Sequence, residues 1–598
     1  MFARILPLLR LPRRFGVFDY RVPDGVRVAV GDLVRVPFHG RTIVGAVAAL
    51  SDVTEVRGDL SDVQDVAFPA ALGAGDIART TSLAQAIAQS PSTLLHYAFG
   101  APNGDRALPR AAHASPASLS LPREVADAVS AAVAALDGAM TLSCQLSPEG
   151  AYALAQVLRK RTREQLLIVV PRERDADLLG RTIAFGGHTA VLHGHTKPAE
   201  RERIIHAWRS GAVTTLIGTL QASLLPAKRI GLVLVMTTGT DDHFSNRRNP
   251  RLDTRLAAEA QAAQHGAPLV LCDSLPRPED RSAADRSVVL APSQAVVVDL
   301  RRPEESTGSE LVTERLLAEM KTALQSQKKV LLFYNRKGVA RRVQCRSCGH
   351  VLTCRDCGSI PKVADAACEC PRCRASFPIP DACPSCTHGR LGLKGIGNAH
   401  LEKSLAEFLP GTTIARIEKG RPPDVDANVL LVTEYYFANV AAPFAPKAFG
   451  LVADACIDLS MNPDDFRAAE TTARKLHRLS QFARQQGASC VIQTWMPDAI
   501  VPMTDADVFL TNERAVRERY ALPPYGAVIT VRHADAEAVA AVVGAPFIPE
   551  PEILGAIGRI PYDTLSASIA QLAALPDTAV ISVDQTYVRT HRAPQSES

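Results

Sequence analysis

The sequence predicts a multidomain α/β protein of 598 residues. Two sets of short apolar runs alternate with helical segments, an arrangement typical of parallel sheets covered by helices. The first set comprises LLIVV, TTLIG, LVLVM and LVLC, and the second comprises VLLFY, VLLVT, GLVAD and CVIQT. Alternating apolar and polar residues before position 100 predict a small β-rich domain, and a cysteine-dense segment interrupts the second set.

These patterns divide the chain into five expected parts. They are a β-rich N-terminal domain at 1–104, a linker at 105–122, a first α/β lobe at 123–290, a second α/β lobe at 291–500 with a cysteine-rich insertion at 344–390, and a small α+β domain at 501–598. The linker is rich in proline, alanine and serine, a composition that suits a connection between domains.

The composition is that of a soluble globular protein, with 46% hydrophobic and 22% charged residues and a net charge of +5. Basic residues nevertheless gather in two stretches: residues 1–45 hold eight arginines against three aspartates, and residues 336–394 hold eleven Arg and Lys against four acids. No apolar run reaches the roughly 18 residues that cross a bilayer. We therefore expect a cytoplasmic protein, without a membrane partner, whose cysteines are reduced.

The cysteine-dense segment gives the strongest chemical signal. Four Cys-x-x-Cys units are present, namely Cys345/Cys348, Cys354/Cys357, Cys370/Cys373 and Cys383/Cys386. Each unit offers two thiolates from one turn, and two units complete a tetrahedral Cys₄ shell around Zn²⁺. The sequence therefore predicts two structural Zn²⁺ ions as cofactors, with a redox dithiol or an iron–sulfur cluster as alternatives. Cys368 is expected to be a bystander.

Longer motifs extend this pattern over most of the chain. They are LLFYNRKGVARRVQCRSCGHVLTCRDC and GLKGIGNAHLEKSLAEFLPG around the cysteines, FDYRVP and VRVPFHGR near the N-terminus, LHGH, PAERERIIHAW and LIGTLQASLLP in the first lobe, and DDFRAAE and LPPYG later. In these motifs the chain resembles the replication-restart primosomal helicases of the PriA family. The resemblance implies two tandem RecA-like helicase lobes with a two-zinc insertion, and an N-terminal domain that binds a 3′ DNA end.

The resemblance also implies which cysteines share an ion. Cys345, Cys348, Cys383 and Cys386 would hold one zinc, and Cys354, Cys357, Cys370 and Cys373 the other.

DNA contacts follow from the same resemblance. Phe18, Asp19 and Tyr20 match the family's Phe-Asp-Tyr, whose rings would stack on the terminal base while the carboxylate accepts a hydrogen bond. Gly40 and Arg41 match the next motif, from which His39 departs. The alternative is that Phe18 and Tyr20 are core residues of a strand and that Asp19 is a turn acid. Phosphate contacts are expected from the arginine-rich N-terminal face and from Arg336, Lys337, Arg341, Arg342 and Arg346, unless these form only a solvated surface.

The family's nucleotide motifs are missing. A P-loop requires G-x-x-x-x-G-K-[ST], but the expected position reads CQLSPEGAY, with Gly150 alone and no lysine before Lys160. The acids expected directly after LVLVM are replaced by residues 237–240, and Asp241 and Asp242 come later, so that only a register slip would restore them. The Gly-Ser-Ala-Thr-Pro motif reads CDSLP, and the last helicase motif reads HRLSQFARQQG, with Arg484 out of register. ATP is therefore not expected as a working cofactor.

These features predict a DNA-binding replication-restart protein that recognises stalled or abandoned forks, helps to reload the replication machinery and lacks helicase activity. Its expected partners are branched DNA or replication forks, primosome and helicase-loading proteins and, as a further candidate, single-stranded DNA-binding protein. The family's winged-helix module has no room in the 105–122 linker. Two other hypotheses are an active ATP-dependent DNA helicase with unorthodox motifs and a zinc-ribbon scaffold that does not bind DNA.

Overall fold

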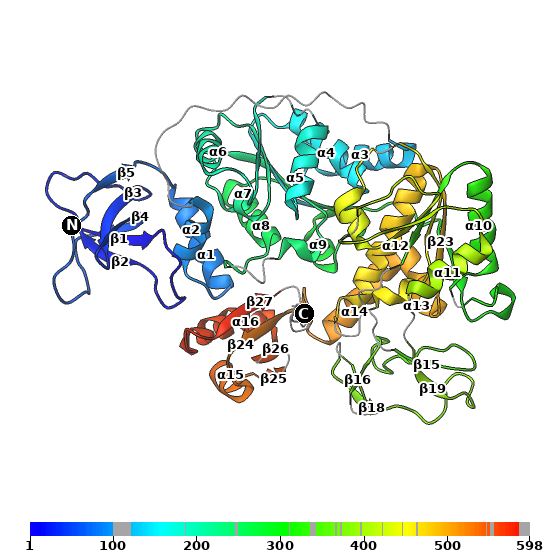
Figure 1. The fold of residues 1–598 in the computed structure, drawn as a ribbon. Coiled ribbons are helices and arrows are strands. Elements are labelled where there is room, and N and C mark those ends of the chain that lie inside the picture. The colour runs from blue at the N-terminus through cyan, green and yellow to red at the C-terminus, as the bar shows by residue number, and fades with distance from the viewer. Residues whose placement is uncertain are drawn as a thin grey trace.

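The chain begins with a five-stranded antiparallel sheet in the order β2-β1-β4-β3-β5. Its strands are β1 (Phe2–Pro7), β2 (Phe18–Arg21), β3 (Leu33–Phe38), β4 (Arg41–Ser51) and β5 (Asp65–Phe68). Ile5, Val34 and Val47 are buried on one face of this sheet, and their chain neighbours Leu6, Leu33 and Ala46 are buried on the other, because successive side chains of a strand point to opposite faces. Two helices follow, α1 (Ala74–Ala86) and α2 (Pro91–Phe99), and lead to the first lobe (Figure 1).

The computed structural model describes the chain except for residues 100–120, 184, 186, 245–248, 310, 335–341, 365–366, 371–372, 395–397, 421, 445, 462–464, 546, 551–554 and 585–598. Most of the expected linker at 105–122 thus lies outside the described residues. In the part of the chain that is described, no helix is both long and apolar enough to cross a membrane.

The first lobe is built on a seven-stranded parallel sheet in the order β12-β6-β11-β10-β7-β9-β8. Its strands are β6 (Thr141–Gln145), β7 (Gln165–Val169), β8 (Thr189–Leu192), β9 (Thr215–Gly218), β10 (Ile230–Met236), β11 (Leu269–Asp273) and β12 (Arg286–Val288). One face is covered by α3 (Arg123–Ala135), α4 (Pro148–Arg161) and α5 (Glu173–Thr182). The other face is covered by α6 (Pro198–Ser210), α7 (Leu220–Leu224) and α8 (Thr254–His265), and α9 (Pro278–Ala283) precedes β12.

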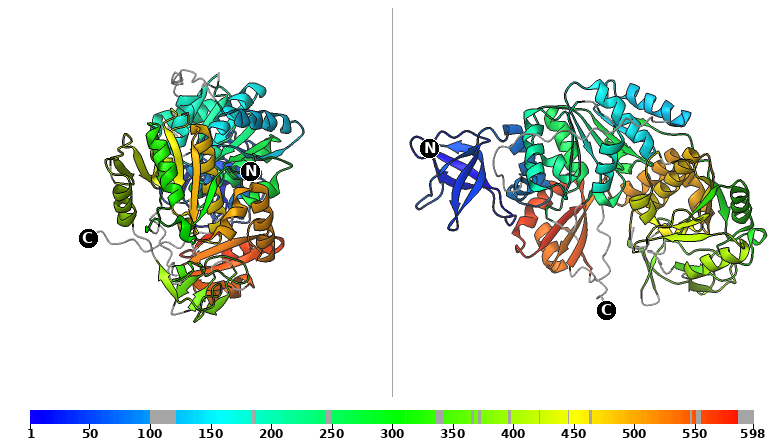
Figure 2. Two further views of the ribbon diagram at one scale, coloured as in Figure 1. Left: turned by 90° about the vertical axis from the view of Figure 1, so that its right-hand side faces the viewer. Right: turned by 45° about the horizontal axis from the view of Figure 1, so that its top comes forward.

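The second lobe has a six-stranded parallel sheet in the order β13-β23-β22-β14-β21-β20. Its strands are β13 (Val296–Asp299), β14 (Lys329–Phe333), β20 (Ile414–Ile417), β21 (Val429–Val432), β22 (Phe449–Asp454) and β23 (Ser489–Thr494). Helix α12 (Ala468–Gln486) packs on one face, while α10 (Glu314–Gln325) and α11 (Asn398–Phe408) pack on the other. The two lobes lie side by side in Figure 1 and in the right-hand view of Figure 2, and the expected α/β class is confirmed.

The cysteine-rich insertion leaves the second lobe after β14 and returns before α11. It contains a two-stranded sheet of β15 (Arg342–Cys345) and β19 (Leu391–Lys394), and a three-stranded sheet of β16 (Lys362–Ala364), β17 (Ala367–Glu369) and β18 (Ser376–Pro378). The insertion buries few apolar side chains. Its small apolar cluster has Val343, Leu352 and Cys368 as its buried members.

The C-terminal part begins with α13 (Pro497–Ile500) and α14 (Ala506–Arg519), and Phe509 and Leu510 of α14 belong to the second-lobe core. An antiparallel sheet follows in the order β25-β26-β24-β27, with its own core. Its elements are β24 (Gly526–Arg532), α15 (Ala536–Val543), β25 (Phe547–Glu550), β26 (Gly555–Pro561), α16 (Tyr562–Gln571) and β27 (Val580–Asp584).

The N-terminal domain is joined tightly to its neighbours. One continuous apolar cluster runs from Leu6 and Leu33 of the sheet through Leu94 of α2 to Trp208 and Leu269 of the first lobe. On the other side, Arg13 donates hydrogen bonds to the carbonyls of Ala579 at 2.9 Å and Pro576 at 2.7 Å in the C-terminal domain. The domain is therefore not suspended on a flexible arm.

Candidate functional site

All four Cys-x-x-Cys units fold into the same tight turn. The amide four residues after the first cysteine donates to that cysteine's carbonyl oxygen in each unit, at Gly349, Gly358, Arg374 and Thr387. Each of these four residues has a positive φ, between 64° and 73°. Glycine adopts this backbone without strain, whereas Arg374 and Thr387 carry a side chain that disfavours it. The turn points both sulfurs of a unit to the same side.

The turns assemble in pairs into two Cys₄ clusters. Cys345, Cys348, Cys383 and Cys386 form one, and Cys354, Cys357, Cys370 and Cys373 form the other, as the family resemblance implied. Four Sγ–Sγ separations across the paired units lie between 3.4 and 3.7 Å. Zn–S bonds of about 2.3 Å in a tetrahedron place sulfurs about 3.8 Å apart. Each cluster can therefore hold a metal ion, and its geometry is compatible with zinc.

Gly389 makes room for one cluster, and Cys368, two residues before Cys370, joins neither. A Cβ at Gly389 would lie 2.4 Å from Cys345 Sγ, so that only glycine fits there. Cys368 is fully buried among apolar residues and belongs to neither cluster. The pKa of the Cys357 thiol falls to about 4, because Cys370 donates a hydrogen bond to its sulfur.

The loop expected to bind nucleotide lies between β6 and α4. Ser147 caps α4, and its hydroxyl accepts a hydrogen bond from the amide of Gly150 at 3.2 Å. Glu149 is buried in the first turn, where it bonds to Ser147, to Gln485 and to the backbone of Phe444. Burial raises the pKa of Glu149, although these hydrogen bonds oppose the shift. A helix N-terminus attracts anions, but here the protein's own carboxyl group already lies at it.

Phe444 of the second lobe closes the same place from the opposite side. Its ring packs against the first-lobe core and lies 6.2 Å from the ring of Tyr152 on α4. Its segment is fixed to the first lobe by Arg174, which donates to the carbonyls of Ala438 at 3.1 Å and Ala441 at 2.6 Å. The space at the start of α4 is thus filled by side chains from both lobes.

The acids after β10 are not restored by a register slip. Two of the residues that follow the strand bond elsewhere: Thr238 donates to Asp280 at 2.5 Å and Gly239 to Asp273 at 2.5 Å. Asp241 and Asp242 lie beyond them in a 3₁₀ turn, Asp241–His243. The imidazole of His243 is completely buried, its Nε2 is 2.9 Å from the carbonyl of Met236, and burial lowers its pKa to about 3.

The arginines of α12 are all paired with carboxylates. Arg478 bonds to Glu434 at 2.7 Å and Arg484 to Glu124 of the first lobe at 2.6 Å. Arg474 contacts Glu470 and lies 3.6 Å from Asp273 of the first lobe. A Cβ at Gly239 would lie 1.8 Å from Arg474 Nε, and so the glycine allows this approach.

A buried ionic cluster joins both lobes and α14. Arg517 is fully buried and pairs with Glu279 of the first lobe at 3.1 Å, with Glu513 at 2.9 Å and with Glu470 of the second lobe. Arg467 pairs with Glu279 and, at 3.0 Å, with Glu470. Burial alone would raise the pKa of Glu470, but Arg474, Arg517 and Arg467 hold it well below its usual value. The lobes are thus held together by charges that cannot separate without becoming unpaired.

The predicted DNA-end residues lie at one end of the N-terminal sheet. The ring of Phe18 is half-buried, 5.3 Å edge-on from Phe38 and 6.0 Å from the stacked ring of Phe15. Asp19 accepts a hydrogen bond from the hydroxyl of Thr54 at 2.5 Å and lies 3.8 Å from Arg4.

Tyr20 and the hairpin shape this end. Tyr20 is buried and its hydroxyl donates to the carbonyl of Pro37 at 3.0 Å, which is the core position that the alternative hypothesis gave it. His39 and Gly40 both have positive φ, 46° and 75°, as the two central residues of a tight hairpin turn require. Arg41 follows and is exposed. The structure therefore brings Phe18 close to the hairpin tip through Phe38.

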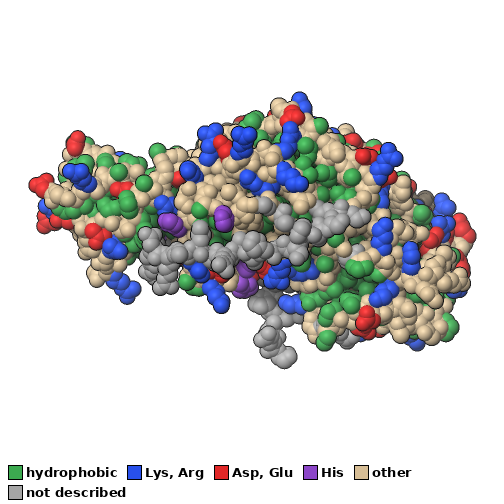
Figure 3. Space-filling view, turned by 90° about the horizontal axis from the view of Figure 1, so that it is seen from above, with side chains coloured by type: hydrophobic (Ala, Val, Ile, Leu, Met, Phe, Trp, Pro, Cys, Tyr) green, Lys and Arg blue, Asp and Glu red, His purple; other side chains and the backbone are tan. Residues whose placement is uncertain are grey.

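The second predicted basic group is only partly visible. Arg336, Lys337 and Arg341 lie outside the described residues, and so does the side chain of Arg342. Arg346 is exposed beside the first cysteine cluster. On the face shown in Figure 3, basic side chains of the described residues are spread over the molecule among acidic ones and form no single basic patch.

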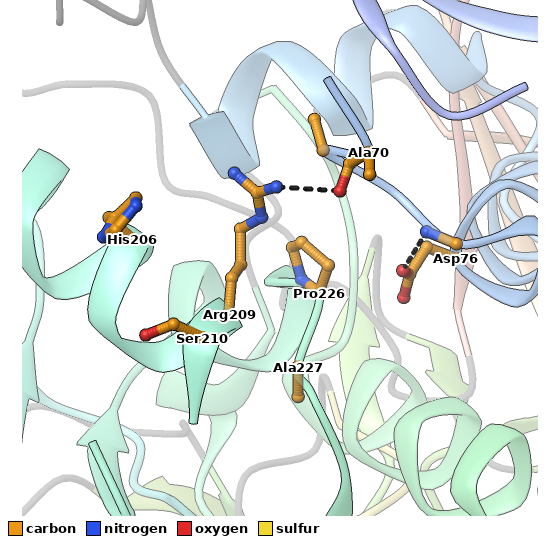
Figure 4. Close-up of a pocket in the computed structure, with 9 residues that line it drawn as sticks. Ala70, Asp76, His206, Arg209, Ser210, Pro226 and Ala227 are labelled. Carbon is orange, nitrogen blue, oxygen red and sulfur yellow. Dashed lines mark hydrogen bonds between the residues drawn. The ribbon is translucent and has the colours of Figure 1, made fainter. Parts of the chain in front are cut away.

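A pocket of about 220 Å³ lies where the N-terminal helices meet the first lobe (Figure 4). Its polar groups are used for packing: Arg209 donates to the carbonyl of Ala70 at 3.1 Å, and Asp76 accepts from the amide of Gly73 at 2.8 Å. Arg209 thus ties the first lobe to the N-terminal domain at this pocket.

Sequence reasoning missed the residues that close the cleft. The sequence motifs include Glu149 and Glu470, in CQLSPEGAY and DDFRAAE, but assign neither a role, and they do not include Phe444, Glu279 or Arg517. Their partners lie far away along the chain, so local spacing carries no signal for them. A buried arginine on α14 could have been suspected only from the apolar residues around it.

Comparisons with known families agree with this geometry. A family described as 3'DNA-binding domain (3'BD) matches residues 8–95, and one described as Helicase conserved C-terminal domain matches residues 150–224 in the first lobe. Two parallel lobes, paired Cys₄ clusters and these matches define the class as helicase-like proteins with a DNA-end-binding domain.

Curated relatives narrow this class. The chain is 24% identical over 575 residues to the Replication restart protein PriA of Rickettsia felis, covering 88% of this chain and 87% of that protein. It is 28% identical over 383 residues to that of Treponema pallidum, covering 57% of this chain and 55% of that protein. The resemblance to the PriA family is confirmed. Among solved structures, a DEAD box protein from Methanococcus jannaschii matches with 11% identity and a TM-score of 0.30, covering 66% of this chain and 91% of that one.

Proposed function

We propose that this protein is a DNA-binding replication-restart factor that captures a free 3′ end at a stalled fork and does not unwind DNA with ATP. The match of residues 8–95 to a 3'DNA-binding domain supports the binding role. The PriA relatives support the place of that role in replication restart. Its partners would be forked DNA together with primosome and helicase-loading proteins, and single-stranded DNA-binding protein is a further candidate.

The tip of the N-terminal sheet supports the proposed DNA contact. The half-buried ring of Phe18 could stack on a terminal base, as aromatic side chains do in single-strand binding. Asp19 is held by Thr54 and Arg4, so its carboxylate has a fixed position from which to accept a hydrogen bond from the terminal nucleotide. Arg41 would contact a phosphate. Tyr20 would act indirectly, by fixing the hairpin through Pro37.

The single observation that carries the absence of a motor is the filled start of α4. A phosphate would have to displace Phe444 and would meet the Glu149 carboxyl group instead of a lysine. Phosphoryl transfer relies on positive charge placed around the developing negative charge. The described arginines of α12 that face the first lobe are committed to carboxylates, which supports the same conclusion.

The two Cys₄ clusters would bind structural Zn²⁺. All four tetrahedral positions of each cluster are filled by sulfur, so the ions would have no open position for catalysis. Metal binding would supply the folding free energy that the small apolar cluster of the insertion cannot provide.

The decisive experiment titrates the protein with forked DNA that has or lacks a free 3′ end, at several salt concentrations, while ATP turnover is followed in the same samples. We expect tighter binding to the fork with the 3′ end, a decline in affinity with salt and no turnover. Fork-stimulated turnover would establish the active-helicase hypothesis instead. Failure to bind any fork at low salt would establish the scaffold hypothesis.

Two variants locate the contact. Phe18→Ala should remove about 1–3 kcal/mol of base stacking, and Asp19→Asn should reduce the preference for the 3′ end. Val30→Ala is the matched control, because Val30 is an exposed apolar residue of the same domain and lies outside the predicted DNA-end motifs. Equal loss of affinity in the control and in Phe18→Ala would show that the tip is not the binding site.

A further inference from the structure

Two histidines and a glutamate meet at the end of the first-lobe sheet. His193 and His195 follow β8, and Glu173 is the first residue of α5. One ligand atom from each of the three side chains lies within 4.8 Å of the other two. This group is far in the sequence from the cysteine clusters and takes no part in the proposed DNA contact.

Two of the three side chains already contact each other. Nδ1 of His195 is hydrogen-bonded to Oε2 of Glu173. The side chain of His193 is 12% exposed and held in place, whereas that of His195 is 85% exposed and can turn. Ligands at about 2.0 Å in a tetrahedral zinc site lie about 3.3 Å apart. The three ligand atoms lie within 4.8 Å of one another and must move closer to bind one ion, and the exposed ring of His195 has room to turn.

Neighbouring residues support this arrangement. His193 Nε2 is 3.3 Å from Asp177 Oδ1, the kind of carboxylate contact that orients the ring of a metal-bound histidine. The ligand atom of His193 is then Nδ1, and a metal ion would displace the hydrogen bond that Nδ1 accepts from the backbone amide of His195 at 3.3 Å. A Cβ at Gly194 would lie 2.5 Å from Glu173 Oε1, so the glycine between the two histidines lets the carboxylate approach. Arg201 shapes the turn by donating to the carbonyl of Thr196 at 3.2 Å.

We propose that Glu173, His193 and His195 form a third metal site, which binds a divalent transition-metal ion such as Zn²⁺ or Co²⁺. Imidazole and carboxylate are ligands that suit these ions. Three protein ligands leave a fourth position for water or for an external oxygen ligand, unlike the closed Cys₄ clusters. Asp177 is a positioning residue in this site, because it acts through His193.

The test is Co²⁺ binding to untagged full-length protein whose cysteine clusters have first been filled with Zn²⁺. We expect one further equivalent of Co²⁺, with the visible absorption of nitrogen and oxygen ligation and without sulfur-to-metal charge transfer. His195→Ala and Glu173→Gln should abolish this equivalent. Asp177→Asn should weaken it about 10- to 100-fold.

His188→Ala is the matched control, since His188 is an exposed histidine on the same lobe outside the cluster. It should bind Co²⁺ like the wild type. Binding of no further equivalent, or of one that survives both His195→Ala and Glu173→Gln, would overturn the proposal. Zn²⁺ content of the cysteine clusters and fork binding are measured on the same samples, and both should be unchanged.

Discussion

The cysteine insertion and the cleft between the lobes differ in what occupies their interior. In the insertion, eight sulfurs converge on two points and their spacing leaves room for an ion. In the cleft, the protein's own groups fill the space, with Phe444 and Glu149 at the start of α4 and Arg517 among three glutamates. The insertion can therefore take up metal ions, whereas the described residues of the cleft fill the space themselves.

The difference teaches what each region preserves. In the insertion, four sulfurs in each cluster face one common point at a spacing that a metal ion fits. In the cleft the buried charged groups are already paired with one another, and paired buried charges cannot be exchanged for a ligand without a large cost. Four experiments test this contrast, in order of decreasing expected effect.

The largest effect is expected from Cys370→Ser. It removes one of four ligands, and structural zinc sites contribute on the order of 10–16 kcal/mol of apparent binding free energy. The variant should lose one of two Zn²⁺ equivalents in a metal assay, and its insertion should become sensitive to proteolysis. Cys368→Ser is the control, since Cys368 is buried two residues away but ligates nothing. Loss of metal in the control would mean that the clusters are assigned incorrectly.

Next is Arg517→Met, which leaves Glu279 and Glu470 short of a buried partner. Breaking a buried pair in this way costs about 3–5 kcal/mol. Urea unfolding followed by the two tryptophans should show a lower midpoint, because Trp208 lies in the first lobe and Trp495 in the second. Arg519→Met, at an exposed position on the same helix, should change the midpoint little. Equal stability of the two variants would contradict the role of the Arg517 ion pairs in holding the lobes together.

A pH-dependent effect is expected from Glu149→Gln. Burial raises the pKa of Glu149 in the folded protein, so the wild type loses stability as pH rises from the unfolded value of about 4.3 through the folded one. The glutamine does not titrate. The variant should therefore match the wild type near pH 4 and be the more stable of the two at pH 8, as measured by thermal unfolding.

Glu407→Gln, at a site that is 65% exposed, should show no such dependence on pH. A Glu149→Gln variant that is less stable at pH 8 would mean that the charged carboxylate stabilises the cleft.

The smallest effect is expected from Thr387→Gly. Thr387 has a φ of 64°, and a non-glycine residue in this region costs on the order of 1 kcal/mol or more. Glycine should stabilise the turn by about that amount, which a chelator competition would detect as slower metal loss. Ser385→Gly, in the same Cys-x-x-Cys unit, is the comparison. No difference between the two variants would show that the turn is not strained.

The sequence predicted those parts of the molecule that depend on local spacing. The ligand turns follow from two cysteines three positions apart, and the parallel lobes follow from runs such as those in β7 and β10. Tyr20 shows the limit of this reasoning. A tyrosine at this position fits both the DNA-end motif and a buried strand position, and the sequence alone does not distinguish the two. The contact between Glu149 and Phe444 joins residues in different lobes, and no local pattern encodes such a meeting.

The apolar cluster that runs from the N-terminal sheet into the first lobe has a practical consequence. A fragment that starts after α2 would expose the face against which Leu94 packs, and we expect it to aggregate. The intact molecule would present a captured DNA end to the lobes at one constant angle. Such a protein would bind only those forks whose geometry fits this fixed arrangement of its domains.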